Sequence, residues 1–376
     1  MIQGSYQMAG RISGDKRMAA IVAIVVCWSS LPASGQPLED PALVNRRSTE
    51  TLEAARAASP HTAETASAYY VDDAETAAAR AIERVWDPTQ PRPEPPRTSW
   101  GDPDLSGYWL NVSYTPRQRP VELANKPLYS REEAIEVFQS AVARDSSIDT
   151  ATVHYDWREF GMDNWQSPMR PNRRTSLIID PANGRLPPMT PEGRERAEAR
   201  RMGMTLESRG LYERCITGNQ GPPRLPIRQN TGQSQLVQTP DYIVLITQAN
   251  SEVRTFPLQD TSGPPDRVRS WLGSSRGHWE GDTLVVETTN FHEGRPSPDM
   301  HLIERFARID EDTILYEATV TDPTTWEAPW SVEVPWPKMD PPGLFEFACH
   351  EQNYGIINVL RGVRARSAEN EGEVAQ

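Results

Sequence analysis

The sequence lacks the short motifs that mark the commonest metal and nucleotide sites. None of its six histidines and three cysteines falls into a His-x-His, His-x-x-x-His or Cys-x-x-Cys spacing. A metal site would therefore need residues that are distant in the sequence, and the candidates are His278, His350 and Glu351. No glycine-rich phosphate loop follows a predicted strand. We therefore expect neither a metal ion nor any other cofactor.

Positive charge is also scarce. The chain has 39 Lys and Arg residues against 52 Asp and Glu residues, a formal net charge of −13. Nucleic-acid affinity rests on Lys and Arg at phosphates, and an anionic membrane surface attracts the same residues, so the balance argues against both partners. The expected partner is a small-molecule substrate or ligand, and the composition carries no signal of an oligomeric state.

Long hydrophobic runs are absent except near the N-terminus. Met18–Trp28 is an apolar run that follows a basic stretch, and the small residues Ala33-Ser34-Gly35 come after it. This order is typical of a secretory signal peptide, which we place at residues 1–35. The run is shorter than the roughly 20 apolar residues of a spanning helix, so we predict a periplasmic or secreted protein with no membrane span after cleavage. An uncleaved anchor is the alternative.

Cysteine is rare, and the predicted cleavage removes one of the three. Cys215 and Cys349 then remain, in a compartment that permits disulfide formation. We predict a Cys215–Cys349 disulfide bond. The alternative is two separate buried thiols, which behave as small apolar residues.

The composition divides the chain into four parts. Residues 36–97 form an Ala- and Glu-rich leader that ends in a proline-rich linker. Residues 98–366 are long enough for one domain with a sizeable core. Residues 367–376 are polar and are predicted to be a disordered tail.

Two helices stand out in the predicted domain. Ser130 and Glu133 have the spacing of a capping box, which predicts a helix over 131–144. Thr190-Pro191 opens a second helix that ends near Met202, because proline is favoured at the first helical position.

The rest of the domain has the alternation and turn signals of antiparallel strands. A tight turn is predicted at Glu280-Gly281, which would place His278 opposite Thr283 and Trp279 opposite Asp282. The fold class is therefore mainly β: an antiparallel meander that closes into a barrel-like, calycin-like core, with two or more peripheral helices and long Pro-rich loops. Strands are predicted at 176–180, 235–238, 242–247, 252–258, 278–279, 282–291, 302–309, 313–321, 331–336 and 344–350.

Four further blocks of the sequence are distinctive: WGDPDL from Trp100, RTSLIID from Arg174, SRGHWEGDTLVVETTNF from Ser275 and CHE from Cys349. They resemble recurrent blocks in an uncharacterised family of secreted bacterial proteins. The resemblance implies export and a single domain, and it assigns no catalytic residue. Gly107-Tyr108-Trp109 also resembles, weakly, the Gly-x-Trp of the first lipocalin strand, which implies a barrel with a ligand cavity.

The candidate catalytic residues are two histidines with nearby carboxylates. Histidine acts as a general acid or base near neutral pH, and a carboxylate can orient it. We assign acid–base roles to His278 and His350, with Glu351 and Asp282 as orienting groups. The predicted substrate-binding residues are Arg276, for an anionic group, and Trp279, Tyr354 and Trp109. A structural role in turns or in the core is the alternative for each.

These residues lead to three functional hypotheses. The first is a cofactor-independent enzyme (a lyase, isomerase or hydrolase) that uses histidine–carboxylate chemistry on a small organic or sugar-derived substrate. The second is a lipocalin-like carrier of a small apolar ligand, whose histidines would lie outside the cavity. The third is an envelope interaction protein, which would expose a large apolar patch.

Overall fold

The computed structural model describes residues 74–123, 125–147, 168–202, 209–217, 221–226, 232–259, 268–292, 297–339, 343–351 and 353–374. The chain divides into two compact units, Met1–Pro60 and His61–Gln376, and all described residues belong to the second. The predicted signal peptide and the first part of the predicted leader lie outside the described residues.

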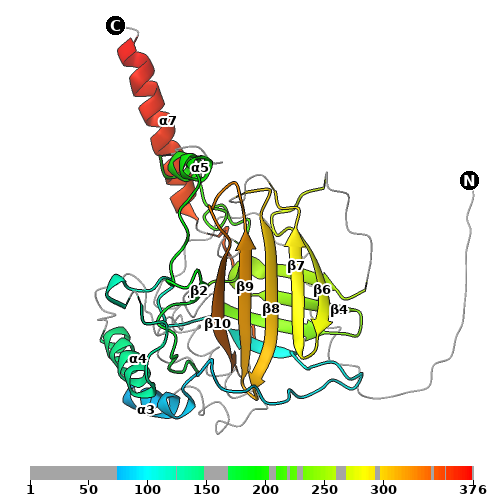
Figure 1. The fold of residues 1–376 in the computed structure, drawn as a ribbon. Coiled ribbons are helices and arrows are strands. Elements are labelled where there is room, and N and C mark those ends of the chain that lie inside the picture. Colours follow the sequence, from blue (N-terminus) through cyan, green and yellow to red (C-terminus); the bar gives the residue numbers. More distant parts are fainter. Residues whose placement is uncertain are drawn as a thin grey trace, which may run out of the picture. The chain divides into compact units, whose positions relative to one another are not determined.

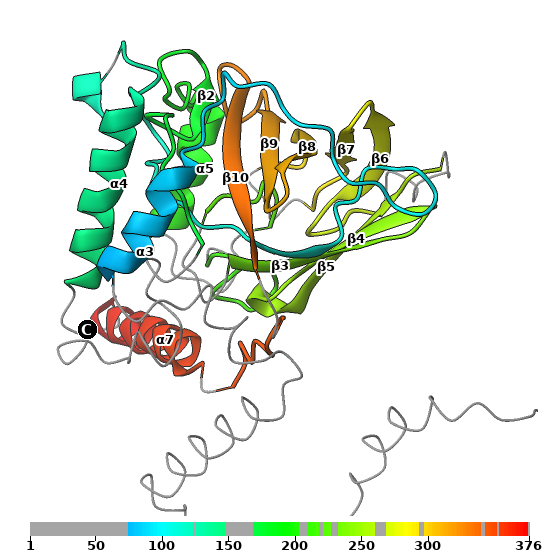
Figure 2. The ribbon, with the colours of Figure 1, turned by 90° about the horizontal axis from the view of Figure 1, so that it is seen from below.

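The described strands form one antiparallel sheet that curves into a nearly closed barrel, which confirms the predicted fold class. Neighbouring strands follow the order β5-β4-β3-β1-β10-β9-β8-β7-β6, and the short β2 pairs with β10. Figure 1 shows the wall from β10 to β6, and Figure 2 shows β3, β4 and β5 facing it. The strands are β1 (Gly107–Leu110), β2 (Ile178–Asp180), β3 (Gln233–Gln238), β4 (Tyr242–Thr247), β5 (Glu252–Pro257), β6 (Ser274–Glu280), β7 (Thr283–Thr289), β8 (His301–Asp310), β9 (Thr313–Thr321) and β10 (Trp330–Met339).

Four α-helices accompany the sheet in the described part of the chain: α3 (Ala74–Ala81), α4 (Arg131–Ser146), α5 (Pro191–Met202) and α7 (Tyr354–Val374). Both predicted helices are confirmed. α4 begins after Ser130, whose side chain accepts from the backbone N–H of Glu133, and the Glu133 side chain accepts in return from the Ser130 N–H. The short 3₁₀ helices are Ile82–Arg84, Val121–Leu123 and Ala249–Ser251.

Alternate residues of each strand point into the barrel and form its core. Trp109, Phe256, Phe306 and Trp336 are fully buried there, and Tyr316 stacks on Trp336 with ring centroids 4.8 Å apart. This aromatic layer fills the interior with large rigid groups, which contribute much of the buried area of such a core.

The folded part of the chain begins before residue 98, within the region predicted to be leader and linker. α3 packs on α4, and the two helices lie side by side in Figures 1 and 2. Trp86 is buried against Ile309 and Leu315, and its indole N–H donates to Glu333 at 3.3 Å. These contacts attach residues 74–97 to the barrel.

The barrel is completed between β5 and β6 by side chains. Arg254 of β5 donates to Ser275 of β6 at 3.2 Å and to Thr288 of β7 at 3.1 Å. Gly277 of β6 lies so close to β5 that an added Cβ would stand 3.0 Å from Leu258. The seam between the two edge strands is therefore covered on the inside by Arg254 and packed tightly at Gly277.

Three local predictions differ from the structure. The β6–β7 turn lies at Gly281-Asp282, so His278 pairs with Val285 and Trp279 with Leu284. Residues 344–350 form a loop and not a strand. Helix α7 extends to Val374, through most of the segment for which a disordered tail was predicted.

Candidate functional site

His278 lies on the outer face of the barrel. In β6 the residues Gly277 and Trp279 point inward, so His278 points outward and is exposed. Its Nε2 atom lies 3.3 Å from a carboxylate oxygen of Glu280, and Arg305 donates to the other oxygen at 2.7 Å. Arg305 first, and then His278, hold the pKa of Glu280 below its usual value. These contacts form an exposed ionic cluster.

The other predicted residues near His278 take separate directions. Arg276 is exposed on the same outer face. Asp282, in the turn, pairs with Arg97 at 2.6 Å and does not contact His278. Trp279 is half-buried against the core, and Trp109 is fully buried, with the Arg308 guanidinium 5.6 Å from its ring centroid. The structure therefore divides these residues between the outer face and the core.

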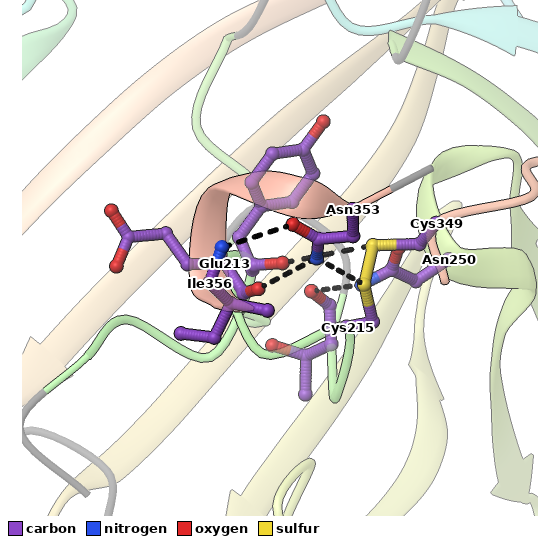
Figure 3. The surroundings of a disulfide bond; sticks show 8 residues. Glu213, Cys215, Asn250, Cys349, Asn353 and Ile356 are labelled. Carbon is purple, nitrogen blue, oxygen red and sulfur yellow. Dashed lines mark hydrogen bonds between the residues drawn. A yellow bond between two sulfur atoms is a disulfide. The ribbon is translucent and has the colours of Figure 1, made fainter. Parts of the chain in front are cut away.

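His350 lies beside the predicted disulfide bond, which the structure confirms. The Cys215–Cys349 bond holds the loop before α7 against residues 211–217, and the Asn353 amide donates to the carbonyl of Glu213 at 3.2 Å (Figure 3). A cleft of about 390 Å³ lies between residues 213–216 and the first turns of α7, and His350 lines it together with Arg214 and Ile357.

The predicted partners of His350 are only partly brought together with it. Glu351 lines a second hollow of about 200 Å³, which the two disulfide-bonded cysteines and His350 also line. Tyr354 begins α7 and is exposed. His278 lines neither of these two hollows. The two candidate histidines therefore do not share a described pocket.

A buried ionic network that was not predicted crosses the barrel interior. Arg254 is bidentate to Glu304 of β8, with N···O distances of 3.0 and 2.5 Å, and both side chains are at most 1 % exposed. Burial alone would lower the pKa of Arg254, but the charge and hydrogen bonds of Glu304 outweigh burial and raise it. Arg254 therefore stays charged, and its bond to Glu304 joins β5 to β8 across the seam.

Tyr316 extends this network from the neighbouring strand β9. Its hydroxyl donates to Glu304 at 2.8 Å and accepts from the backbone N–H of Arg224, also at 2.8 Å. Burial, and then the negative charge of Glu304, raise the pKa of Tyr316 well above its usual value. Tyr316 therefore stays neutral and acts as a hydrogen-bond relay between β8 and the loop that carries Arg224.

Arg224 brings a second arginine into the interior from the 221–226 loop. Its Nη1 atom donates to Glu252 of β5 at 3.2 Å, and its side chain is 1 % exposed. The Asn111 amide donates to the Arg224 carbonyl at 3.1 Å and fixes the loop. We call the set Arg224, Glu252, Arg254, Glu304 and Tyr316 the polar layer of the barrel.

The polar layer contains buried donors that have no hydrogen-bond partner. They are Nε and Nη2 of Arg224 and Nε of Arg254, and the indole N–H of the nearby Trp336 is also unpartnered. Buried polar groups in proteins are nearly always paired, and each exception calls for an explanation. Here the unpaired groups are mostly donors, so the layer is suited to a molecule that carries acceptor oxygens.

The sequence does contain a signal for the polar layer. Glu252, Arg254 and Phe256 alternate along one strand and so share a face, and Glu304 shares a face with Phe306. Charged residues on the same face as buried phenylalanines indicate inward-pointing charges. Arg224 has no such signal, because it lies in a loop.

A nucleophile pattern in the same region does not have the required structural context. Residues 273–277 read Gly-Ser-Ser-Arg-Gly, the spacing of a nucleophile elbow, which needs a sharp turn between a strand and a helix. Ser275 instead lies within β6, and its hydroxyl bonds to Thr288 at 2.9 Å. Ser275 therefore supports the seam and is not an activated nucleophile.

The described residues include no group of three or more His, Cys, Asp or Glu side chains placed to hold a metal ion, and no helix among them is long and apolar enough to cross a membrane. No family model matches the chain, and no curated protein matches it either. The resemblance of the sequence blocks to a secreted bacterial family therefore stays a prediction.

Proposed function

We propose that the chain is an exported protein that binds a small organic molecule in the polar layer of its barrel, without a resident cofactor. The observation that carries the proposal is the buried side chain of Arg224, whose Nε and Nη2 donors have no partner. A barrel of this type is a scaffold on which small ligands commonly bind. Export is supported by the N-terminal sequence and by the Cys215–Cys349 disulfide bond.

Binding in the barrel has more support than acid–base catalysis by His278 and His350. His278 is on the outer face in an exposed ionic cluster, and His350 is on a loop beside the disulfide. The carrier hypothesis expected both histidines outside the barrel interior. The enzyme hypothesis stays a prediction, for which His278→Ala and His350→Ala would each abolish turnover; a substrate that both variants still convert would exclude it.

The binding proposal is tested by a ligand screen on the full chain. Saturation-transfer NMR would compare small carboxylates, amides, lactones and monosaccharides on the wild type, on Arg224→Met and on the outer-face control Arg276→Met. We expect at least one class to bind the wild type, with a loss of about tenfold or more in Arg224→Met and no loss in Arg276→Met. Circular dichroism verifies that the variants fold.

Two outcomes would reject the proposal. Binding that is lost in Arg276→Met but kept in Arg224→Met would place the ligand on the outer face, with the residues first predicted there. No binding of any class to the folded wild-type protein would leave the polar layer as a purely structural network.

A further inference from the structure

Arg224 presents one whole edge of its guanidinium group without a partner. Nη1 is held by Glu252, while Nε and Nη2, which point in parallel from the opposite edge, are unpaired. The backbone of the residue is fixed at both ends, by Tyr316 at its N–H and by Asn111 at its carbonyl. This unpaired, buried edge therefore has a defined position in the barrel.

This edge has the geometry of a carboxylate receptor. The parallel N–H groups of arginine match the two oxygens of a carboxylate, and such bidentate pairs are among the strongest hydrogen bonds in proteins. Arg254 shows such a pair within the protein, because its Nη1 and Nη2 atoms donate to the two carboxylate oxygens of Glu304. A buried donor without a partner destabilises the folded state, so the unpaired edge of Arg224 is not explained by stability.

The charges of the layer limit what this edge can bind. Two arginines, Arg224 and Arg254, are balanced by Glu252 and Glu304, while Tyr316 is neutral. A phosphate would add about two uncompensated negative charges to a buried site, whereas a carboxylate adds one.

We propose that the Nε–Nη2 edge of Arg224 binds the carboxylate of a small monocarboxylic acid inside the barrel. The inference rests on the proposed function, that the barrel binds a small molecule, and adds the chemical class of that molecule. The aromatic layer beside it, with Trp336 stacked on Tyr316, would contact the apolar part of the acid.

Charge balance adds a consequence for pH. The ionisable groups that face the site are Glu252 and Arg254 of β5, Glu304 of β8 and Tyr316 of β9. Because the two arginines and the two glutamates are already balanced, we expect the carboxylate to bind together with one proton. Affinity therefore rises as the pH falls, by at most about tenfold per pH unit for one proton.

The test measures the affinity of the full chain for benzoate and phenylacetate, with benzamide as the neutral isostere and inorganic phosphate as the ionic control. Calorimetry at about pH 5.5 and pH 7.5 is expected to show carboxylate binding that is tighter at the lower pH. Arg224→Lys keeps the charge but loses the parallel edge, so binding should fall about tenfold or more. Arg144→Lys, at an exposed position in the last turn of α4, should match the wild type.

An NMR measurement on the wild type tests the inference even if Arg224→Lys does not fold. The ¹⁵N signal of the Arg224 Nε–H group should shift as benzoate or phenylacetate is added. An unshifted signal at saturating carboxylate means that internal water alone pairs the edge, and overturns the inference. If an amide binds through Arg224 and no carboxylate binds, the carboxylate inference is overturned but the proposed function stands. If no compound in the ligand screen binds, both the inference and the proposed function are rejected.

Discussion

At the scale of single residues, the two buried arginines have different roles. Arg254 contacts β6, β7 and β8, and every one of these contacts crosses the seam that the backbone leaves open. Arg224 contacts Glu252 through its side chain and the Tyr316 hydroxyl through its backbone, and two of its three guanidinium nitrogens have no partner. Arg254 is therefore explained by stability of the barrel, while the unpaired nitrogens of Arg224 are the basis of the proposed ligand site.

Removing one partner of the Arg254–Glu304 pair should strongly destabilise the protein. Glu304→Gln leaves the arginine charge buried without compensation, and we expect a loss of about 3–5 kcal/mol in the free energy of unfolding by urea. The double variant Arg254→Met, Glu304→Met removes both charges and should recover much of that loss. Glu287→Gln, at an exposed pair with His301, should cost less than about 1 kcal/mol. A double variant that is no more stable than Glu304→Gln would contradict this role.

Glu317 on β9 should show the opposite pH dependence to Glu280 on β6. Burial, and then the charge of Glu333, raise the pKa of Glu317. The stability that Glu317 contributes is therefore fully present at acid pH and is lost as the pH rises through the pKa of Glu317 in the folded protein. Glu317→Gln should therefore gain stability relative to the wild type as the pH rises. Arg305 lowers the pKa of Glu280, so Glu280→Gln should instead lose relative stability on the same change. Urea unfolding across the acid range measures both, and a shift of the same sign in the two variants would refute the assignment.

The direction of each candidate side chain was predictable, but its partners were not. Alternation in β6 places Gly277 and Trp279 on one face, so the outward position of His278 follows from the sequence. The contacts of Arg224 depend instead on strand β9, where Tyr316 lies 92 residues further along the chain, and on a loop without periodicity. No local pattern encodes such a contact.

At the scale of elements, the hairpin of β6 and β7 was predicted, but its turn was placed one residue too early. Gly281 has a φ of +59°, and the two-residue turn uses it as the first central position, one residue later than predicted. The change moves each pairing by two residues, so the faces of the strands are unaffected. The predicted strand at 344–350 fails for another reason: both edges of β10 are already occupied, by β9 and by β1 and β2.

The capping box of α4 should make a measurable contribution to stability. Ser130→Ala removes the acceptor for the Glu133 N–H, and we expect a loss of about 1 kcal/mol in the free energy of unfolding. Ser146→Ala, at the opposite end of the helix, is the matched control and should change it by less than half as much. Equal effects of the two substitutions would show that the cap is not an important determinant of α4.

At the scale of the whole molecule, the regular spacing of the hairpins made the meander predictable, because consecutive antiparallel strands pair locally. The contacts that complete the fold are long-range. Trp86 reaches Glu333, and Cys215 reaches Cys349 across 134 residues. Only the second of these left a signal in the sequence, since the predicted export and cleavage leave two cysteines, which can form one pair.

Loss of the disulfide bond should destabilise the barrel and release the segment before α7. Closing a loop of 134 residues contributes at most about 5 kcal/mol in the chain-entropy account. Cys215→Ser, Cys349→Ser should therefore lower the thermal midpoint clearly. The Asn353 contacts with Glu213 and Cys215 depend on the bond, so the amides of 353–360 should exchange faster in the double variant than those of β8.

The wild type treated with a reductant is the matched control, because it loses the same bond without a change of sequence. Its thermal midpoint should fall to that of the double variant, and the reductant should have no further effect on the variant. Binding in the polar layer should survive at temperatures where both forms remain folded, because Arg224 is held by Tyr316, Asn111 and Glu252 and not by the disulfide. If binding disappears with the bond while the barrel stays folded, the ligand occupies the cleft beside His350.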